Sequence, residues 1–192
     1  MSIAPLVVVV SGPSGVGKDA LLERMKRLTR PWHFIITATT RPRRPGEQDS
    51  VDYIFMKPSA FQDLLARDGF LEHAEVYVRC YGVPRDQVEE ALHAGKDVIV
   101  KTDVQGARTI RNKIPDALLV FLAPPDLQEL EQRLRDRKSE TAEDLQRRIE
   151  TARMEMQRQP EFDHVVVNHN GRLDEAVATI ENIIDDEKRK RA

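Results

Sequence analysis

The sequence predicts an α/β fold of the layered kind, with a mostly parallel core sheet flanked by helices. Short apolar runs alternate along the chain with longer segments in which apolar residues recur at helical spacing. The run Val-Ile-Val at 98–100 has no polar residue between its members, which is typical of a parallel strand buried on both faces. With 192 residues, the chain is long enough for one compact domain and short for two.

The strands of the core sheet are predicted from short apolar runs that turn residues or prolines bound. These strands cover residues 6–10, 97–102, 118–122 and 165–167. A further strand is expected at 34–39. The prolines and the glycine of 41–46 then predict an exposed loop.

The first helices are predicted from their apolar spacing and from the residues at their ends. The first helix begins near Lys18. Ser59 and Gln62 form a capping box at the start of the second helix, and Gly69 ends it. The third helix covers about 84–95 and has a proline in its first turn.

Three more helices follow towards the C-terminus. Asp126 caps the first of them, with Glu129 three residues on. The second covers about 142–159 and ends before a proline. The last helix has an apolar stripe formed by Leu173, Val177, Ile180 and Ile184. The charged residues at 187–191 are expected to be a frayed, solvated end.

Composition limits the classes of function. The chain has 30 basic and 32 acidic side chains, so it lacks the basic excess of a dedicated nucleic-acid binder. Cys80 is the single cysteine, which excludes an intramolecular disulfide and is typical of a reducing compartment. The apolar run at 6–10 is far shorter than a membrane span and lacks the pattern of a signal peptide. We therefore expect a cytoplasmic protein with no membrane or nucleic-acid partner.

The strongest motif is Gly-Pro-Ser-Gly-Val-Gly-Lys at 12–18, between the first predicted strand and the first helix. In a phosphate loop of this kind, backbone N–H groups face inward and the helix N-terminus adds its positive end. The motif indicates a P-loop kinase fold that binds ATP, with Lys18 reaching the β- and γ-phosphates. The alternative is a plain glycine-rich turn with an exposed lysine. The candidate ATP-binding residues of this segment are Gly12, Pro13, Ser14, Gly15, Val16, Gly17, Lys18 and Asp19.

Beyond this loop the sequence resembles guanylate kinase over about residues 6–185. The motifs occur in the order of that family: Thr-Thr-Arg-Pro-Arg-Arg-Pro-Gly-Glu at 39–47, Val-Asp-Tyr at 51–53, Gly-Phe-Leu-Glu-His-Ala-Glu at 69–75, Tyr-Gly-Val-Pro at 81–84, Asp-Val-Gln-Gly-Ala at 103–107, Pro-Pro at 124–125 and Val-Asn at 167–168. The resemblance implies phosphoryl transfer from ATP to GMP, giving ADP and GDP, with Mg²⁺ as metal cofactor. Such a reaction belongs to purine nucleotide metabolism and GMP recycling.

The resemblance also implies how the single domain, residues 1–192, is divided. The core is expected at 5–34, 97–125 and 159–185. A GMP-binding subdomain is expected at about 35–96, and a mobile helical lid at about 126–158.

By the same resemblance, the residues that hold the phosphate of GMP are Arg41, Arg44, Tyr53 and Tyr81. Guanidinium forks bind a dianionic phosphate with a bidentate geometry that lysine lacks. The alternative for the basic segment at 41–44 is a solvated loop.

Glu72 matches the family residue that reads the guanine edge. A carboxylate accepts hydrogen bonds, and guanine presents N1–H and its amino group as adjacent donors, whereas adenine does not. Asp103 is expected to contribute, and Thr37 takes the place of a family serine that donates to guanine O6. Val83 stands where the family has serine or threonine, so one base contact is expected to be missing or made through water. The alternative for both carboxylates is an ordinary surface position.

The residues implied in catalysis are Lys18, Arg41 and the lid arginines Arg133, Arg137 and Arg148. In the family, such arginines close over the transferring phosphoryl group, stabilise its charge and exclude water. Arg133 and Arg137 are four residues apart and therefore share one helix face. The alternative is a pair of solvated, salt-bridged helices. Asn168 matches the adenine side of the ATP site.

Two residues depart from the family pattern. Asp19 stands where the family offers a hydroxyl to Mg²⁺, and Lys101 stands where the strand before Asp-Val-Gln-Gly carries an acidic residue. The strand before the phosphate loop and the strand that carries Lys101 should end side by side at the ligand crevice, so we expect Asp19 and Lys101 to lie close together. Asp19 is then a candidate metal ligand, and Lys101 offsets its charge or pairs with it when nucleotide is absent. The alternative is two unrelated substitutions, with Lys101 pointing to solvent.

Two other functions match parts of the sequence. A ribose 1,5-bisphosphate phosphokinase resembles the chain in a phosphate loop ending Gly-Lys-Asp and in a Tyr-Gly-x-Pro stretch. The motifs at 39–47 and 103–107, however, resemble those of guanylate kinase. A non-catalytic guanylate-kinase-like module that binds a protein partner typically loses the loop lysine or the lid arginines, and this chain keeps them. The sequence leaves the oligomeric state open.

Overall fold

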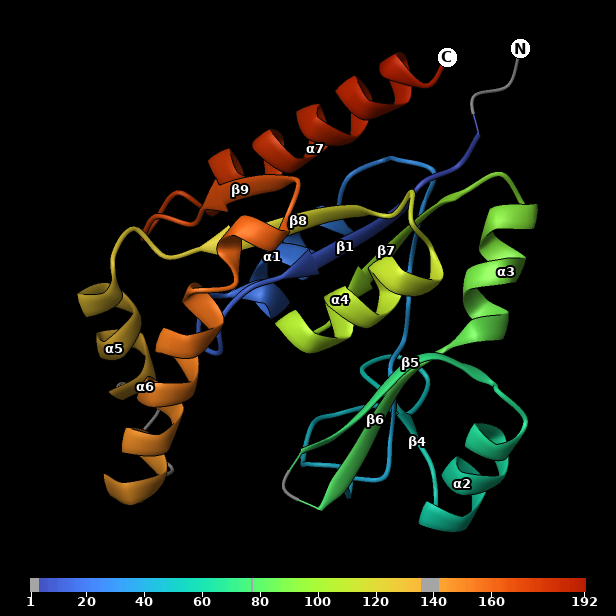
Figure 1. Cartoon of the computed structure of the whole chain (residues 1–192), viewed down its shortest axis with the longest axis horizontal. Helices are drawn as coiled ribbons and strands as arrows, with labels where there is room; N and C mark the ends of the chain where they lie inside the picture. The colour runs from blue at the N-terminus through green and yellow to red at the C-terminus, as the bar shows by residue number, and fades with distance from the viewer. Residues whose placement is uncertain (1–3, 77, 136–141) are drawn as a thin grey trace.

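The structure is a computed structural model that describes residues 4–76, 78–135 and 142–192. Its central element is a five-stranded sheet in the order β2-β7-β1-β8-β9, in which neighbouring strands are parallel (Figure 1). The strands of this sheet are β1 (Val7–Ser11), β2 (Trp32–Phe34), β7 (Asp97–Lys101), β8 (Leu118–Ala123) and β9 (His164–Val167). The carboxyl ends of β1 and β7 lie side by side, with Val10 paired to Lys101.

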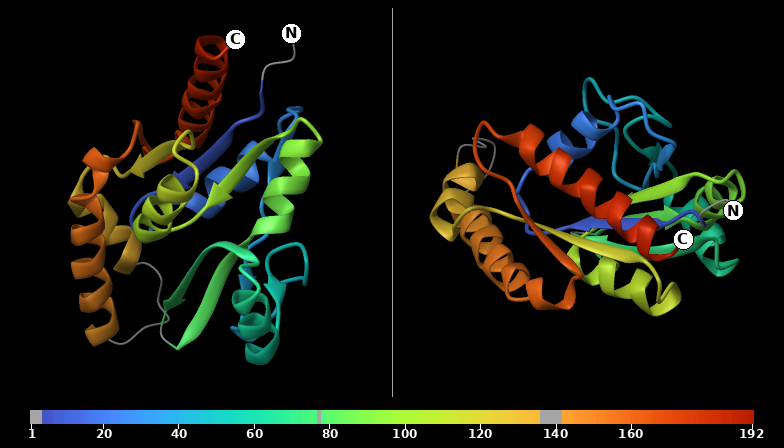
Figure 2. Two further views of the ribbon diagram at one scale, coloured as in Figure 1. Left: turned by 45° about the vertical axis from the view of Figure 1, so that its right-hand side comes forward. Right: turned by 90° about the horizontal axis from the view of Figure 1, so that it is seen from above.

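Helices cover both faces of this sheet, because its central strands are apolar on both sides. The covering helices are α1 (Lys18–Met25), α3 (Arg85–His93), α4 (Val104–Lys113) and α7 (Leu173–Lys190). Val8 and Val10 of β1 are buried in one cluster with residues of α1 and α7. Val7 and Val9 are buried in another cluster with residues of α3 and α4. Figure 2 shows α7 and α4 on opposite sides of the sheet.

A second, four-stranded sheet lies beside the carboxyl ends of the central strands (Figure 1). Its order is β4-β3-β6-β5, and its strands are β3 (Ala38–Thr39), β4 (Ile54–Phe55), β5 (Phe70–Val76) and β6 (Arg79–Pro84). Helix α2 (Pro58–Ala66) packs on it through Phe61, whose ring stacks on Phe70 with centroids 4.3 Å apart. Both rings are almost fully buried, so this small sheet has its own core.

Two helices, α5 (Leu127–Arg135) and α6 (Ala142–Met156), form a pair at one side of the molecule. Leu130 and Leu134 of α5 are buried together with Ile149 and Ala152 of α6. The amide of Glu129 donates to Asp126 Oδ1 at 2.7 Å, which confirms the predicted cap. Among the described residues, none of the helices combines the length and the apolarity that a membrane span requires.

The strand predicted at 34–39 is two short strands in different sheets. β2 ends at Phe34 in the central sheet, and β3 begins at Ala38 in the second. Between them, the side-chain amide of Gln87 pairs with the backbone of Ile36, accepting from its N–H and donating to its carbonyl, both at 3.0 Å. Because a side chain satisfies this backbone, the chain can leave one sheet and enter the other.

The predicted ends of three helices also need correction. Helix α2 begins at Pro58, and its N-cap is Lys57 without a side-chain hydrogen bond, so the capping box of Ser59 and Gln62 does not form. The helix ends at Ala66, ahead of Gly69. Pro84 is the N-cap of α3 and not a member of its first turn. Helix α6 ends at Met156, and the proline that follows lies in a separate 3₁₀ turn, η1 (Gln159–Glu161).

The C-terminal segment at 187–191 is ordered, contrary to the expectation of a frayed end. Helix α7 continues to Lys190. The ammonium of Lys188 donates to both carboxylate oxygens of Asp97, at 2.7 and 2.8 Å. Arg191 donates to the carbonyl of Asp116 at 3.0 Å. These contacts hold the last turn of α7 against the central sheet.

Candidate active site

The phosphate loop lies between β1 and α1, as the sequence predicts. Two of its glycines occupy positions that a side chain could not share. Gly12 has φ 141°, and a Cβ there would lie 2.2 Å from the carbonyl oxygen of Leu122. Gly17, the N-cap of α1, has φ 102°, and a Cβ there would lie 2.7 Å from Asn168 Nδ2. The backbone of the loop therefore packs directly on β8 and on Asn168, the residue that follows β9.

Lys18 bends back over this loop. Its ammonium donates to the carbonyl oxygens of Gly12, at 2.5 Å, and Pro13, at 3.1 Å. Burial lowers the pKa of Lys18 below its ordinary value, and the carboxylates of Glu155 and Asp19 oppose this shift. A buried ammonium at the N-terminus of a helix is placed to bind an anion.

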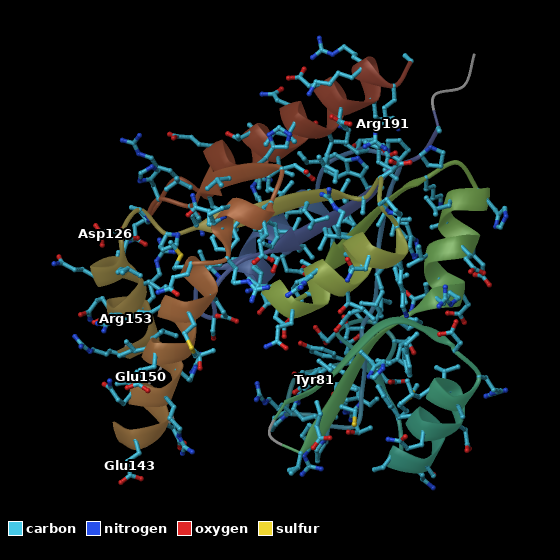
Figure 3. The ribbon with its side chains drawn as sticks, viewed as in Figure 1. Tyr81, Asp126, Glu143, Glu150, Arg153 and Arg191 are labelled. Carbon is cyan, nitrogen blue, oxygen red and sulfur yellow. The ribbon has the colours of Figure 1, made fainter. Side chains whose placement is uncertain are left out.

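A cavity of about 570 Å³ brings together the residues predicted to bind the phosphate of GMP. Its lining includes Arg41, Arg44, Tyr53 and Tyr81. Figure 3 shows Tyr81 on β6. The ring centroids of Tyr53 and Tyr81 are 6.3 Å apart, and the guanidinium of Arg41 lies 5.2 Å from the centroid of Tyr53. This part of the cavity therefore gathers phenolic and guanidinium groups, which can both donate hydrogen bonds to an anion.

Glu47 holds Arg41 in place, a role that the sequence did not predict. Arg41 donates to the two carboxylate oxygens of Glu47 at 2.7 and 3.0 Å, and the amide of Arg44 donates to Glu47 at 2.7 Å. The hydrogen bonds from Arg41 lower the pKa of Glu47 to about 2. Glu47 therefore fixes the segment at 41–44 through hydrogen bonds to the side chain of Arg41 and to the backbone of Arg44.

Glu72 and Asp103 lie in a smaller cavity of about 240 Å³. Glu72 is only 5% exposed, so the surface position considered for this residue is wrong. Burial, followed by the charge of Asp103, raises its pKa to about 7, and Thr102 Oγ1 donates to its Oε2 at 3.3 Å. Asp103 accepts from the amide of Gly106 at 2.8 Å and so caps α4. A buried carboxylate with one weak donor is suited to a ligand that brings donors of its own.

The two cavities share several lining residues, which are Thr37, Tyr53, Tyr81 and Lys101. The smaller cavity also includes Lys18 and the buried Val83. The phosphate loop, the paired carboxylates and the arginine–tyrosine group therefore open onto neighbouring spaces.

Arg133 and Arg148 both contact the phosphate loop. Arg133 donates to the carbonyl of Val16 at 3.1 Å, to that of Asn168 at 2.8 Å and to Asn170 Oδ1 at 3.0 Å, and it also pairs with Glu129. Arg148 donates to Ser14 Oγ at 3.1 Å. The residue predicted between them, Arg137, lies outside the described residues. Asn168 is buried and donates through Nδ2 to the carbonyl of Val16 at 2.8 Å.

Glu155 is a site residue that sequence reasoning missed. It lies on α6, and its Oε2 accepts from the backbone amide of Ser14 at 2.9 Å. Burial raises its pKa, which the hydrogen bond from Ser14 and the charge of Lys18 oppose. The sequence signal for Glu155 is weak, because it follows Ala152 by three residues and only the structure shows that Ala152 is buried.

Asp19 and Lys101 lie together, as predicted from the two strand ends. Lys101 Nζ is 2.5 Å from Asp19 Oδ1. Lys101 does not point to solvent, since its side chain is 26% exposed, and its ammonium lies 5.6 Å from the ring centroid of Tyr53.

Comparison with known proteins places the chain in one family. The family profile described as guanylate kinase matches residues 5–187. Guanylate kinase 2, chloroplastic/mitochondrial, of Oryza sativa subsp. japonica is 42% identical over 187 residues, which are 97% of this chain and 66% of that protein. The guanylate kinase of Synechococcus sp. (strain CC9902) is 45% identical over 175 residues, which are 91% of this chain and 92% of that protein.

A solved structure leads to the same assignment. The crystal structure of guanylate kinase from Anaplasma phagocytophilum matches with a TM-score of 0.77 at 28% identity, and the match covers 97% of this chain and 88% of that one. Sequence motifs, fold and relatives agree over nearly the full length. The chain belongs to the guanylate kinase family.

Proposed function

We propose that the chain transfers the γ-phosphoryl group of ATP to GMP and so forms ADP and GDP, a step of purine nucleotide metabolism. The observation that carries this proposal is the buried carboxylate of Glu72 in a cavity that also contains Lys18. The relatives support the same reaction, since each of those compared is named a guanylate kinase.

ATP is proposed to bind along the phosphate loop. Its β- and γ-phosphates would accept from the ammonium of Lys18 and from the backbone amides of Gly15, Gly17, Lys18 and Asp19. Pro13 has no N–H, and the amides of Ser14 and Val16 already have acceptors. The loop carbonyls that Lys18 now contacts are neutral acceptors, so a phosphate oxygen is the stronger partner. Asn168, which already fixes the loop through Val16, is proposed for the adenine side of this site.

The phosphate of GMP is proposed to bind between Arg41, Arg44, Tyr53 and Tyr81. A dianionic phosphate has enough acceptor oxygens for two guanidinium groups and two phenols. The ion pair with Glu47 keeps Arg41 oriented before the substrate arrives, which lowers the conformational cost of binding.

Guanine is proposed to be read by Glu72, with help from Asp103 and Thr37. The carboxylate of Glu72 would accept from N1–H and from the 2-amino group, and Thr37 would donate to O6. AMP would leave the buried carboxylate without donors, at a considerable cost in free energy. Val83 supplies no hydrogen bond to the base, so selectivity rests on the acidic side of the cavity.

Catalysis in this proposal is positioning and charge stabilisation. The attacking oxygen of GMP is already anionic, so no general base is needed. Lys18 and Arg41, together with Arg133, Arg137 and Arg148, would stabilise charge on the transferring group. We further propose that residues of about 126–158 act as the lid and those of about 35–96 as the GMP-binding subdomain, around a core of 5–34, 97–125 and 159–185.

Mg²⁺ is the proposed metal cofactor. Within the described residues, no group of three or more His, Cys, Asp or Glu side chains could hold a metal ion by itself. Asp19 offers one carboxylate in the first turn of α1, and its side chain is 75% exposed. One carboxylate completed by water and phosphate oxygens is a set that Mg²⁺ commonly adopts, so the residues fit an ion shared with ATP. Bound there, such an ion would supply positive charge that offsets the charge of the ATP phosphates.

The alternatives considered from the sequence gain no support. Neither the fold nor the relatives favour a ribose 1,5-bisphosphate phosphokinase or a non-catalytic module. The cytoplasmic location stays a prediction from composition.

The proposal is tested by a coupled ADP-release assay with GMP, AMP, IMP and ribose 1,5-bisphosphate offered separately. We expect GMP to be preferred over AMP by up to about 10⁴-fold in kcat/KM, with IMP between them because it lacks only the amino group. Comparable kcat/KM for AMP and GMP, or a preference for the ribose bisphosphate, would contradict the proposed function.

A further inference from the structure

Lys101 lies at the junction of the two cavities. It is the last residue of β7, and it lines both the cavity of about 570 Å³ and that of about 240 Å³. Its ammonium lies over the ring of Tyr53, and the guanidinium of Arg41 lies over the same ring, at 5.6 and 5.2 Å from the centroid. One cation from the end of β7 and one from the loop after β3 thus lie close to the same phenol ring.

Each of these cations has a carboxylate partner, and the two partners differ in exposure. Arg41 is bound by Glu47 through two hydrogen bonds, and the side chains of this pair are only 12% and 19% exposed. Lys101 contacts Asp19, whose side chain is 75% exposed. An ion pair with one solvated partner contributes little, so the contact between Lys101 and Asp19 is readily exchanged.

A site with two convergent cations favours a ligand with two negative charges. Without such a ligand, Lys101 and Arg41 repel each other across Tyr53, and each carboxylate offsets part of that repulsion. A phosphate monoester carries about two charges at neutral pH and bears three acceptor oxygens. It is therefore a stronger partner for Lys101 than one exposed carboxylate.

We propose that Lys101 is a further substrate-binding residue, which leaves Asp19 and contacts the phosphate of the acceptor nucleotide beside Tyr53. This inference rests on the proposed function and names an additional cation in the same acceptor site. Asp19 is the resting partner of Lys101 and competes with the phosphate for it. A purely structural role, in which Lys101 joins β7 to α1 and never leaves Asp19, is the alternative.

Calorimetric titration of GMP, without ATP and without Mg²⁺, separates these roles. Lys101→Met should weaken GMP binding by about 10- to 100-fold, the usual effect of losing one charge-assisted contact. Lys101→Arg should recover most of that loss. Guanosine lacks the phosphate and serves as a competitor in the same titration. Its dissociation constant, obtained from this competition, should be the same for wild type and Lys101→Met. The exposed Lys96→Met serves as the matched control and should bind GMP like wild type.

Asp19→Asn gives the opposite prediction in the same titration. Removal of the competing charge should leave GMP binding unchanged or tighten it by a few fold, whereas a structural pair would lose affinity in both single variants. Unchanged GMP affinity in Lys101→Met, or equal losses for GMP and guanosine, would overturn the inference. If Lys101→Met does not fold, a loss of GMP affinity in Asp19→Asn overturns it, and unchanged or tighter binding supports it. Failure of the wild type to bind GMP would instead reject the proposed function.

Discussion

The backbone amide of Ser14 donates a 2.9 Å hydrogen bond to Oε2 of Glu155, across 141 positions of the sequence. This contact ties the tip of the phosphate loop to α6, the helix that also carries Arg148. The same carboxylate interacts with the ammonium of Lys18 through charge. Helix α6 therefore acts on the loop in two ways, by satisfying its backbone and by balancing its lysine.

Removal of the Glu155 carboxylate should destabilise the loop. Glu155→Ala leaves the Ser14 amide without this acceptor and should lower the free energy of unfolding by about 1–3 kcal/mol in urea titration. Glu155→Gln keeps an acceptor oxygen and avoids the burial of charge, so it should recover most of this loss. Glu150→Ala, on the exposed side of the same helix (Figure 3), should stay within about 0.5 kcal/mol of wild type. Equal stability of all three variants would contradict the anchoring role.

Glu72 should determine the preference for GMP over AMP. Glu72→Gln can turn its amide group towards the donors of guanine, so it should lower the preference for GMP over AMP by about 10²-fold or more in kcat/KM. Unaltered selectivity in this variant would show that another group reads the base.

The same variant predicts a pH dependence of stability. The pKa of Glu72 is raised from 4.5 to about 7 in the folded chain, so the folded state binds its proton more tightly than the unfolded state. The contribution of this protonated carboxyl group to the free energy of unfolding is fully present below about pH 4.5 and is lost as the pH rises towards 7. Glu72→Gln does not titrate, so its free energy of unfolding relative to wild type should rise by about 2–3 kcal/mol between pH 4.5 and pH 8. Denaturant titrations at several pH values measure this difference in the free energy of unfolding. A difference that does not change with pH would contradict the raised pKa of Glu72.

The sequence predicts most of the fold and much of the site, because the signals concerned are local. The phosphate loop at 12–18 is recognised by its glycines, its lysine and the strand and helix on either side, all of which lie next to one another in the sequence. The break between β2 and β3 is not predictable from the sequence, since it depends on the side chain of Gln87, in α3, which binds the backbone of Ile36. The order of the C-terminal turn likewise depends on Asp97, which is 91 positions from Lys188.

The same reasoning explains which site residues were missed. Glu72 and Asp103 were found through motifs, but the burial of Glu72 follows from packing that no motif encodes. Glu155 has its partner 141 positions away, and its helix reads as an ordinary charged helix in the sequence. Glu47 was part of a recognised motif, and only the structure connects it to Arg41.

Arg148 should act on turnover more than on binding. It reaches Ser14 of the phosphate loop from α6, where the transferring group is proposed to lie. Arg148→Ala should therefore lower kcat by about 10²-fold or more while the KM for GMP changes by a few fold at most. Arg147→Ala is the matched control, because the neighbouring Arg147 is 63% exposed and pairs with Asp144 within its own helix. An Arg148→Ala enzyme with unchanged kcat would assign this arginine to the solvated surface.

The contact between Lys188 and Asp97 should stabilise the fold without affecting the reaction. Asp97 is 2% exposed and accepts from the amide of Leu6 at 2.9 Å as well as from Lys188. Lys188→Ala leaves this buried carboxylate without its cation, which should lower the free energy of unfolding by about 2–4 kcal/mol, less than for a fully buried pair because Lys188 is 21% exposed. Lys190→Ala removes a lysine whose side chain is 67% exposed and whose contact with Glu187 is long, at 3.5 Å, so it should cost at most about 0.5 kcal/mol. Asp97 begins β7, at the opposite end from Lys101, so kcat/KM for GMP should be unchanged in both variants at a temperature where they are folded. A loss of stability no larger in Lys188→Ala than in Lys190→Ala would mean that water reaches Asp97 and that the last turn of α7 is not held by this ion pair.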